Sequence, residues 1–161
     1  MILKNRFVLS AKMVFLAALF FFAGESASQT LFGIDISDPD NTKGYQYNNS
    51  LDAAGTEVFV KNDPGIFDRV ILNKGLGYIC TVNHPTASRF SEIYENVVSI
   101  FGYENEIKDL IPKGAIEDDL SELAMLIFEG KAEILRYWYE KKFNIKLQFT
   151  QKNLELYISY F

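Results

Sequence analysis

The chain has 161 residues, with 16 basic and 21 acidic side chains that give a formal net charge of −5 at neutral pH. Nucleic acids and anionic membrane surfaces select clustered lysine and arginine, so this charge balance argues against both as the main partner. A single cysteine, Cys80, allows no disulfide bond within the chain, so the fold must depend on its hydrophobic core. We expect Cys80 to be a small buried core residue, although a disulfide with another molecule stays open.

Residues 1–28 have the parts of an export signal. Three basic side chains accompany the start, an unbroken apolar run occupies residues 13–23, and small residues follow at 26–28. We expect cleavage after Ser28, with Ser26 as the alternative. A retained anchor is the other alternative, but the eleven apolar residues fall short of the about twenty that cross a bilayer as a helix.

The sequence therefore predicts a signal peptide at 1–28 and a single domain at 29–161. We expect a bacterial protein that is periplasmic or secreted and that keeps no stable membrane anchor once the signal is cleaved. Its oligomeric state is left open.

The mature chain begins with a predicted strand at 31–36 and a loop at 38–50. Asp38, Asp40 and Thr42 resemble the opening of a calcium loop, which places oxygen ligands at alternate positions. The glycine and the glutamate that such a loop needs at its sixth and twelfth places are both missing. We therefore expect a solvated loop and no metal site.

An antiparallel meander is expected next, because β-branched and aromatic residues alternate with turn formers. Its predicted strands are 57–61, 67–73 and 76–83, and a helix from Ser88 to Phe101 follows.

Cys80 and His84 are the only thiol and the only imidazole in the chain. On one strand, four residues would separate them by about 13 Å, which is too far for a nucleophile and its base. We expect no joint catalytic role, and we keep His84 as a candidate contact residue.

The longest helical pattern runs from Asp119 to Phe143. Its apolar positions recur at a 3.6-residue period, and Asp119 with Glu122 fits a capping box at the start. Lys131 falls in the middle of the apolar stripe, directly after Gly130. Either the helix kinks at the glycine, or the lysine stem covers apolar surface, or a buried lysine binds an anion or acts as a base.

Three aromatic residues follow one another on the same predicted helix. Trp138 lies on the apolar stripe and is expected in the core, whereas Tyr137 faces away from it. An exposed aromatic side chain is typical of a partner surface, so Tyr137 and Lys131 join His84 as candidate ligand or partner contacts.

Alternation at 145–149 and at 154–160 predicts a C-terminal β-hairpin. The order of elements indicates an α+β fold in which a mainly antiparallel sheet packs one face on both helices. No glycine-rich phosphate loop, nucleophile elbow or paired-histidine zinc motif occurs in the sequence. We therefore predict no catalytic residue and no cofactor.

The chain resembles small exported bacterial α+β proteins of unknown function over most of its mature length. The resemblance implies export and fold class, and it carries over no catalytic or binding residue. It depends on these segments: Phe32-Gly33-Ile34, Phe67-Asp68-Arg69-Val70, Gly77-Tyr78-Ile79, the stretch from Gly130 to Trp138 and the hairpin that ends in Tyr160.

Three functions remain as hypotheses. The first is a non-enzymatic module that binds another protein in the envelope or acts as an inhibitor or immunity factor. The second is a protein that binds a small apolar or aromatic ligand between sheet and helices. The third is a hydrolase whose carboxylates are dispersed in the sequence and meet in a cleft.

Overall fold

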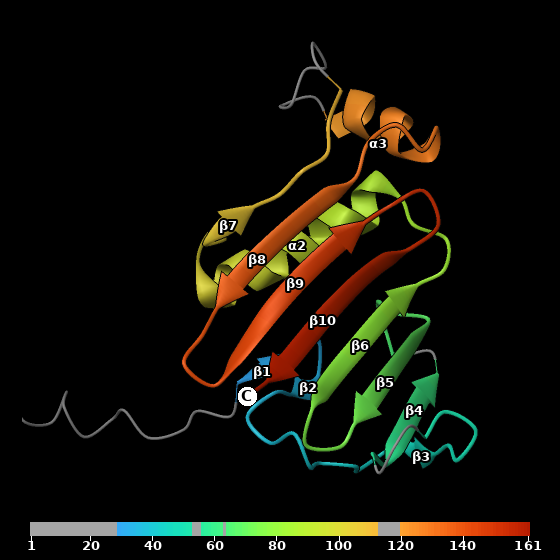
Figure 1. Ribbon diagram of the computed structural model, residues 1–161, viewed down its shortest axis with the longest axis vertical. Helices are drawn as coiled ribbons and strands as arrows, with labels where there is room; N and C mark the ends of the chain where they lie inside the picture. Colours follow the sequence, from blue (N-terminus) through green and yellow to red (C-terminus); the bar gives the residue numbers. More distant parts are fainter. Residues whose placement is uncertain (1–28, 53–55, 63, 113–119) are drawn as a thin grey trace, which may run out of the picture.

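The computed structural model describes residues 29–52, 56–62, 64–112 and 120–161. Within these ranges, eight strands form one antiparallel sheet in the order β3-β4-β5-β6-β10-β9-β8-β7, and β1 pairs with β2 (Figure 1). The α+β prediction is therefore confirmed. The strands are β1 (Thr30–Leu31), β2 (Ile34–Asp35), β3 (Gln46–Tyr47), β4 (Val58–Asn62), β5 (Arg69–Asn73), β6 (Gly77–Val82), β7 (Glu106–Ile107), β8 (Ile134–Tyr139), β9 (Phe143–Phe149) and β10 (Leu154–Tyr160), and the helices are α2 (Ala87–Phe101) and α3 (Leu120–Phe128).

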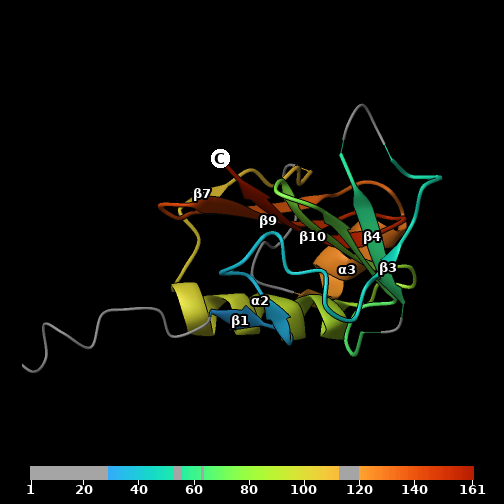
Figure 2. The same ribbon diagram turned by 90° about the horizontal axis from the view of Figure 1, so that it is seen from below.

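Both helices and the β1–β2 hairpin lie on the same face of the large sheet, as Figure 2 shows. We call this the covered face and the opposite one the open face. Phe90 of α2 stacks on Phe149 of β9 with ring centroids 5.5 Å apart, and Phe128 of α3 meets the same ring edge-on at 6.2 Å. These contacts confirm the prediction that both helices pack on one face of the sheet.

The core lies between the covered face and the helices. Alternate residues of β9, from Phe143 to Phe149, are buried, while those between them are half-buried on the open face. This period of two is what burial on one side of a strand requires. Cys80 is completely buried in the same core, and burial raises the pKa of its thiol, so it is the core residue that was expected.

The predicted helix over 119–143 is wrong beyond Phe128. Gly130 has a φ of 70°. Its N–H donates to the carbonyl of Ile127 at 2.9 Å, and the N–H of Lys131 donates to that of Leu126 at 2.8 Å. This pair of bonds is a Schellman motif, which ends a helix at a left-handed residue. The chain then extends into β8, and the predicted capping residue Asp119 lies outside the described residues.

The other helix and the meander are confirmed. Thr86 precedes α2, and its side chain accepts a bond from the N–H of Arg89 at 3.1 Å, which satisfies one unpaired donor of the first turn. Gly102 ends α2 with a φ of 78°. Strands β4, β5 and β6 occupy the predicted meander, and β9 pairs with β10 as the predicted hairpin.

Two shorter segments differ from expectation. The predicted strand at 31–36 is a tight hairpin, because the chain reverses at Phe32 and Gly33, which have φ angles of 54° and 73°. Strand β7, which none of the predicted elements includes, pairs with β8 at the edge of the sheet. No helix in the described ranges is both long enough and apolar enough to cross a membrane. The predicted signal at 1–28 lies outside those ranges.

Candidate functional site

The three side chains predicted to contact a ligand or partner lie apart in the fold. His84 is exposed in the connection between β6 and α2, Lys131 is exposed after α3, and Tyr137 is half-buried on β8. Among the described residues, no hydrogen bond, ion pair or ring contact joins any two of them. Cys80 is buried whereas His84 is exposed, so these two side chains do not face each other as nucleophile and base.

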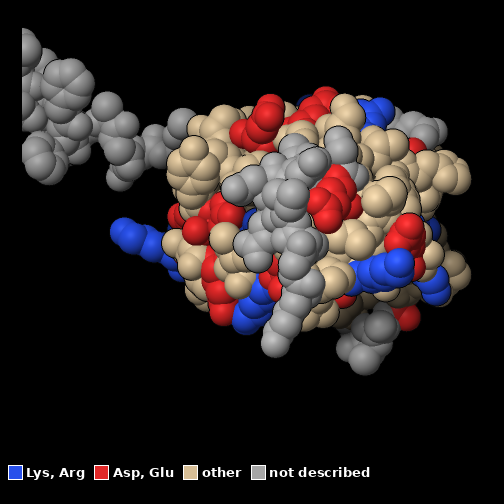
Figure 3. Space-filling view, turned by 90° about the horizontal axis from the view of Figure 1, so that it is seen from above, with Lys and Arg blue, Asp and Glu red and all other residues tan. Residues whose placement is uncertain are grey.

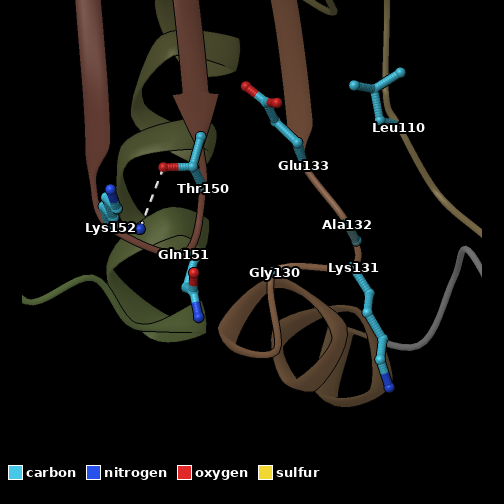
Figure 4. Close-up of a pocket in the computed structure, with 8 residues that line it drawn as sticks. All are labelled: Leu110, Gly130, Lys131, Ala132, Glu133, Thr150, Gln151 and Lys152. Carbon is cyan, nitrogen blue, oxygen red and sulfur yellow. Dashed lines mark hydrogen bonds between the residues drawn. The ribbon is translucent and has the colours of Figure 1, made fainter.

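Lys131 stands at the rim of an open pocket of about 340 Å³. Its ammonium forms an ion pair with Glu129 at 2.7 Å, and 62% of its side chain is exposed. In Figure 4 the side chain extends away from Glu133 and Thr150, which lie across the pocket. Lys131 is therefore not the buried charge that a continuous helix would have made it.

Tyr137 lies on the open face, at one end of a row of side chains that crosses five strands. The register of neighbouring strands places these side chains directly opposite one another. All five are half-buried, and Figure 1 shows no helix in front of them. We call this set the central row: Ile71 of β5, Ile79 of β6, Tyr157 of β10, Lys146 of β9 and Tyr137 of β8.

Lys146 is the charged member of this row. Its Nζ lies 3.8 Å from the centroid of the Tyr157 ring and donates to Oε1 of Gln148 at 3.0 Å. A cation over an aromatic face is attracted by the negative charge of the ring face. The carboxylates nearby have other partners, since Tyr157 Oη donates to Glu155 and Gln148 Nε2 donates to Glu133. Within the described residues Lys146 forms no ion pair, so its ammonium can donate to an added group.

Burial changes the pKa values of Lys146 and Tyr157. It lowers the pKa of Lys146, and the charges of Glu155 and Glu133 oppose that shift. Burial, with the hydrogen bond to Glu155, raises the pKa of Tyr157 to about 12. The hydroxyl of Tyr157 is therefore protonated at neutral pH and remains a hydrogen-bond donor.

The central row is aliphatic at one end and aromatic and cationic at the other. Isoleucine side chains of β5 and β6 supply apolar contact, while the tyrosines and Lys146 supply both contact area and hydrogen bonds. Tyrosine is enriched in protein interfaces because it buries a large ring and keeps a polar tip.

A second cluster of charges lies on the covered face near β7. The guanidinium of Arg136 pairs with Glu104 at 3.1 Å and with Asp109, and these three side chains are 17%, 8% and 9% exposed. Tyr94 of α2 donates to Glu104 at 2.8 Å, and Asp109 accepts the N–H of Leu135 at 2.8 Å. The cluster holds the chain on both sides of β7 against β8, which is a structural role.

The rest of the described surface does not offer a metal site. No group of three or more His, Cys, Asp or Glu side chains in the described ranges is close enough to hold an ion. Figure 3 looks onto the end of the molecule where α3 lies and shows acidic and basic side chains interspersed there.

Sequence reasoning identified Tyr137 but missed its neighbours in the central row. Tyr157 and Lys146 do stand at the outward positions of the predicted hairpin, so the alternation could have marked them. Their contact with Ile79 and Tyr137 depends on the order of the strands in the sheet, and the residue pattern of a single strand does not predict that order. No family model, curated protein or solved structure matches the chain.

Proposed function

We propose that this chain is an exported, non-enzymatic module that binds another protein through the open face of its sheet. The observation that carries the proposal is the central row, in which half-buried aliphatic, aromatic and cationic side chains adjoin across five strands with no helix over them. Aromatic side chains are enriched in interfaces, and tyrosine is among the residues that contribute most binding energy.

Lys146 gives this surface a preference for a partner with a negatively charged group. A carboxylate of the partner that reached its ammonium would take the place of water next to a cation that lacks an ion pair among the described residues. Lys146 would repel a cationic group of the partner, whereas Glu155 and Glu133 nearby would attract it. We favour a partner that places a carboxylate directly over the Lys146 ammonium and surrounds it with apolar side chains.

The test is crosslinking in the envelope of the cells that export the protein. A photoreactive residue would replace Ile79 on the open face, and a matched one would replace Glu95, which is exposed on α2 at the opposite side of the molecule. We expect one dominant protein adduct from position 79, none from position 95, and loss of the adduct when Tyr137→Ala is added. Equal adducts from both positions would contradict the proposal.

The pocket beside Lys131 is the basis of the second candidate, the binding of a small ligand. The space between sheet and helices is filled by packed rings such as Phe90 and Phe149, so the pocket at the rim is where such a ligand would fit. Its volume of about 340 Å³ is near the lower end for ligand sites. Absence of any adduct from position 79 in a folded protein would favour this candidate and make Lys131 the next residue to change. Hydrolysis by dispersed carboxylates is the third candidate.

A further inference from the structure

Strand β7 is an open edge of the eight-stranded sheet, and its backbone is free to pair outward. The N–H groups of Lys108 and Leu110 donate toward β8, to the carbonyls of Leu135 at 3.0 Å and Glu133 at 2.9 Å. Alternate residues of an antiparallel strand direct their N–H and C=O groups to opposite sides. The N–H and C=O of Ile107 therefore point away from β8, and no described strand lies beyond them (Figure 1).

The side chains of β7 are complementary to a copy of themselves. Ile107 is 58% exposed, and the flanking residues carry opposite charges, with Lys108 Nζ 3.0 Å from Glu106 Oε1. A two-fold axis through Ile107 would place Glu106 opposite Lys108 of a second copy, and the reverse. The same axis would pair the two Ile107 side chains and allow their backbones to exchange two hydrogen bonds.

We propose that the protein forms a homodimer by antiparallel pairing of β7 with β7 of a second copy. The two eight-stranded sheets then join into one continuous sheet. This proposal does not depend on the proposed function, because β7 pairs through its own outward backbone and side chains, although Lys108 Nζ also lies 5.0 Å from the centroid of the Tyr137 ring. The other edge offers no such pattern, since β3 and its neighbours at 45–48 are uncharged.

A short strand buries little area, so we expect a weak dimer that forms as concentration rises. Charged side chains normally discourage pairing at a sheet edge. Here the two charges differ in sign and stand two residues apart, so a second copy in this register can replace the ion pair within each copy by two ion pairs between the copies. An extended segment of another protein could use the same edge, but it would not require this symmetric charge pattern.

The test is sedimentation equilibrium of the purified protein over a wide range of concentration. Glu106→Lys places like charges opposite each other twice per dimer, as does Lys108→Glu, so each is expected to raise the dimer dissociation constant about tenfold or more. The double variant restores both attractive pairs with their signs exchanged. It is expected to dimerise as the wild type does.

A matched control is Glu57→Lys, which breaks the exposed pair between Glu57 and Lys74 at 2.6 Å and should not change dimerisation. Circular dichroism of each variant verifies folding. In the wild type, hydrogen exchange at the Ile107 amide should slow as dimers form. A protein that stays monomeric, a dimer that the single variants do not weaken, or a double variant no better than the singles would overturn the proposal.

Discussion

Arg136 has 17% of its side chain exposed and lies on the covered face of β8, between the apolar residues Ile134 and Trp138. Removing one member of a buried ion cluster leaves the others charged and unpaired, which costs about 3 kcal/mol or more. We therefore expect Arg136→Met to lower the free energy of unfolding by about 3 kcal/mol, because Glu104 and Asp109 would keep their burial without a cation. Urea unfolding followed by tryptophan fluorescence measures this change, since Trp138 lies two residues away in the core.

Replacement of an exposed arginine is the control, because it distinguishes the effect of the buried ion cluster from the effect of losing any arginine. Arg89 pairs with Glu92 at 3.4 Å, with both side chains about half exposed. Exposed pairs contribute about 0–1 kcal/mol, so Arg89→Met should change stability by less than about 1 kcal/mol. Similar losses in the two variants would show that the Arg136 cluster does not stabilise the fold as its burial implies.

At the scale of elements, the boundary between α3 and β8 decides the topology of half the sheet. Gly130 adopts a left-handed conformation, with a φ of 70°, that places α3 back on the covered face and starts β8 in register with β9. We expect Gly130→Ala to destabilise the protein by about 1 kcal/mol, because a side chain raises the energy of this conformation. Thermal unfolding measures the loss.

The expected loss at Gly130 comes from its backbone conformation, because the surroundings leave room for a Cβ atom. An added Cβ would lie 3.2 Å from Oε1 of Gln151, the end of a flexible side chain that can move. Gln151 also donates to the carbonyl of Phe128 at 2.9 Å and so caps α3. If Gly130→Asn, which tolerates the left-handed region better, were no more stable than Gly130→Ala, steric contact with Gln151 would be the cause instead.

The same boundary shows how far the sequence determined the fold. Strands β4 to β6, helix α2 and the C-terminal hairpin follow from period, caps and turn residues, and those predictions are confirmed. Strand β8 could not be recognised, because Ile134 and Trp138 are four residues apart, and that spacing shares a face in a helix and in a strand alike. An apolar residue at position 136, between Ile134 and Trp138, would have shown the alternation of a strand. The sequence has Arg136 there, and its acidic partners cannot be identified from the local sequence.

The candidate site was less predictable than the fold. Tyr137 was predicted as a contact residue from its place on a helix, whereas the structure has it on strand β8. The central row arises from the order β5-β6-β10-β9-β8, in which β10 returns to pair with β6 after a long excursion of the chain. Such long-range pairing is set by the packing of the whole core and leaves no periodic mark in one segment.

At the scale of the whole molecule, hydrogen bonds from tyrosine hydroxyls attach the N-terminal segment to the sheet. Tyr78 donates to the carbonyl of Asp38 at 3.1 Å, and Tyr160 donates to that of Ile36 at 2.7 Å, so both hold the N-terminal segment on the sheet. Burial is the main cause of a raised pKa at both, to about 12 for Tyr78. Burial likewise raises the pKa of Tyr94 and of Tyr157 to about 12.

These shifts predict loss of stability in alkaline solution. In the unfolded chain the tyrosines ionise near their ordinary pKa of 10.0, whereas in the folded protein Tyr78, Tyr94 and Tyr157 ionise near 12. Between these values the folded state binds more protons, so the free energy of unfolding falls as pH rises. The contribution is complete below about pH 10 and is lost through about pH 12. Melting temperature against pH, with tyrosinate absorbance as a second signal, measures this fall.

Single replacements test whether the buried hydroxyls cause the alkaline fall. Tyr157→Phe removes one group with a raised pKa and should make the decline less steep, whereas Tyr103→Phe, at a side chain 79% exposed, should leave it unchanged. Lys146 contributes with the opposite sign, because its lowered pKa makes the folded state release its proton first, and stability then rises with pH just below 10.5. Adding Lys146→Met to Tyr157→Phe therefore separates the two effects. If Tyr103→Phe changed the decline as much as Tyr157→Phe did, burial of the tyrosine hydroxyls would not be its cause.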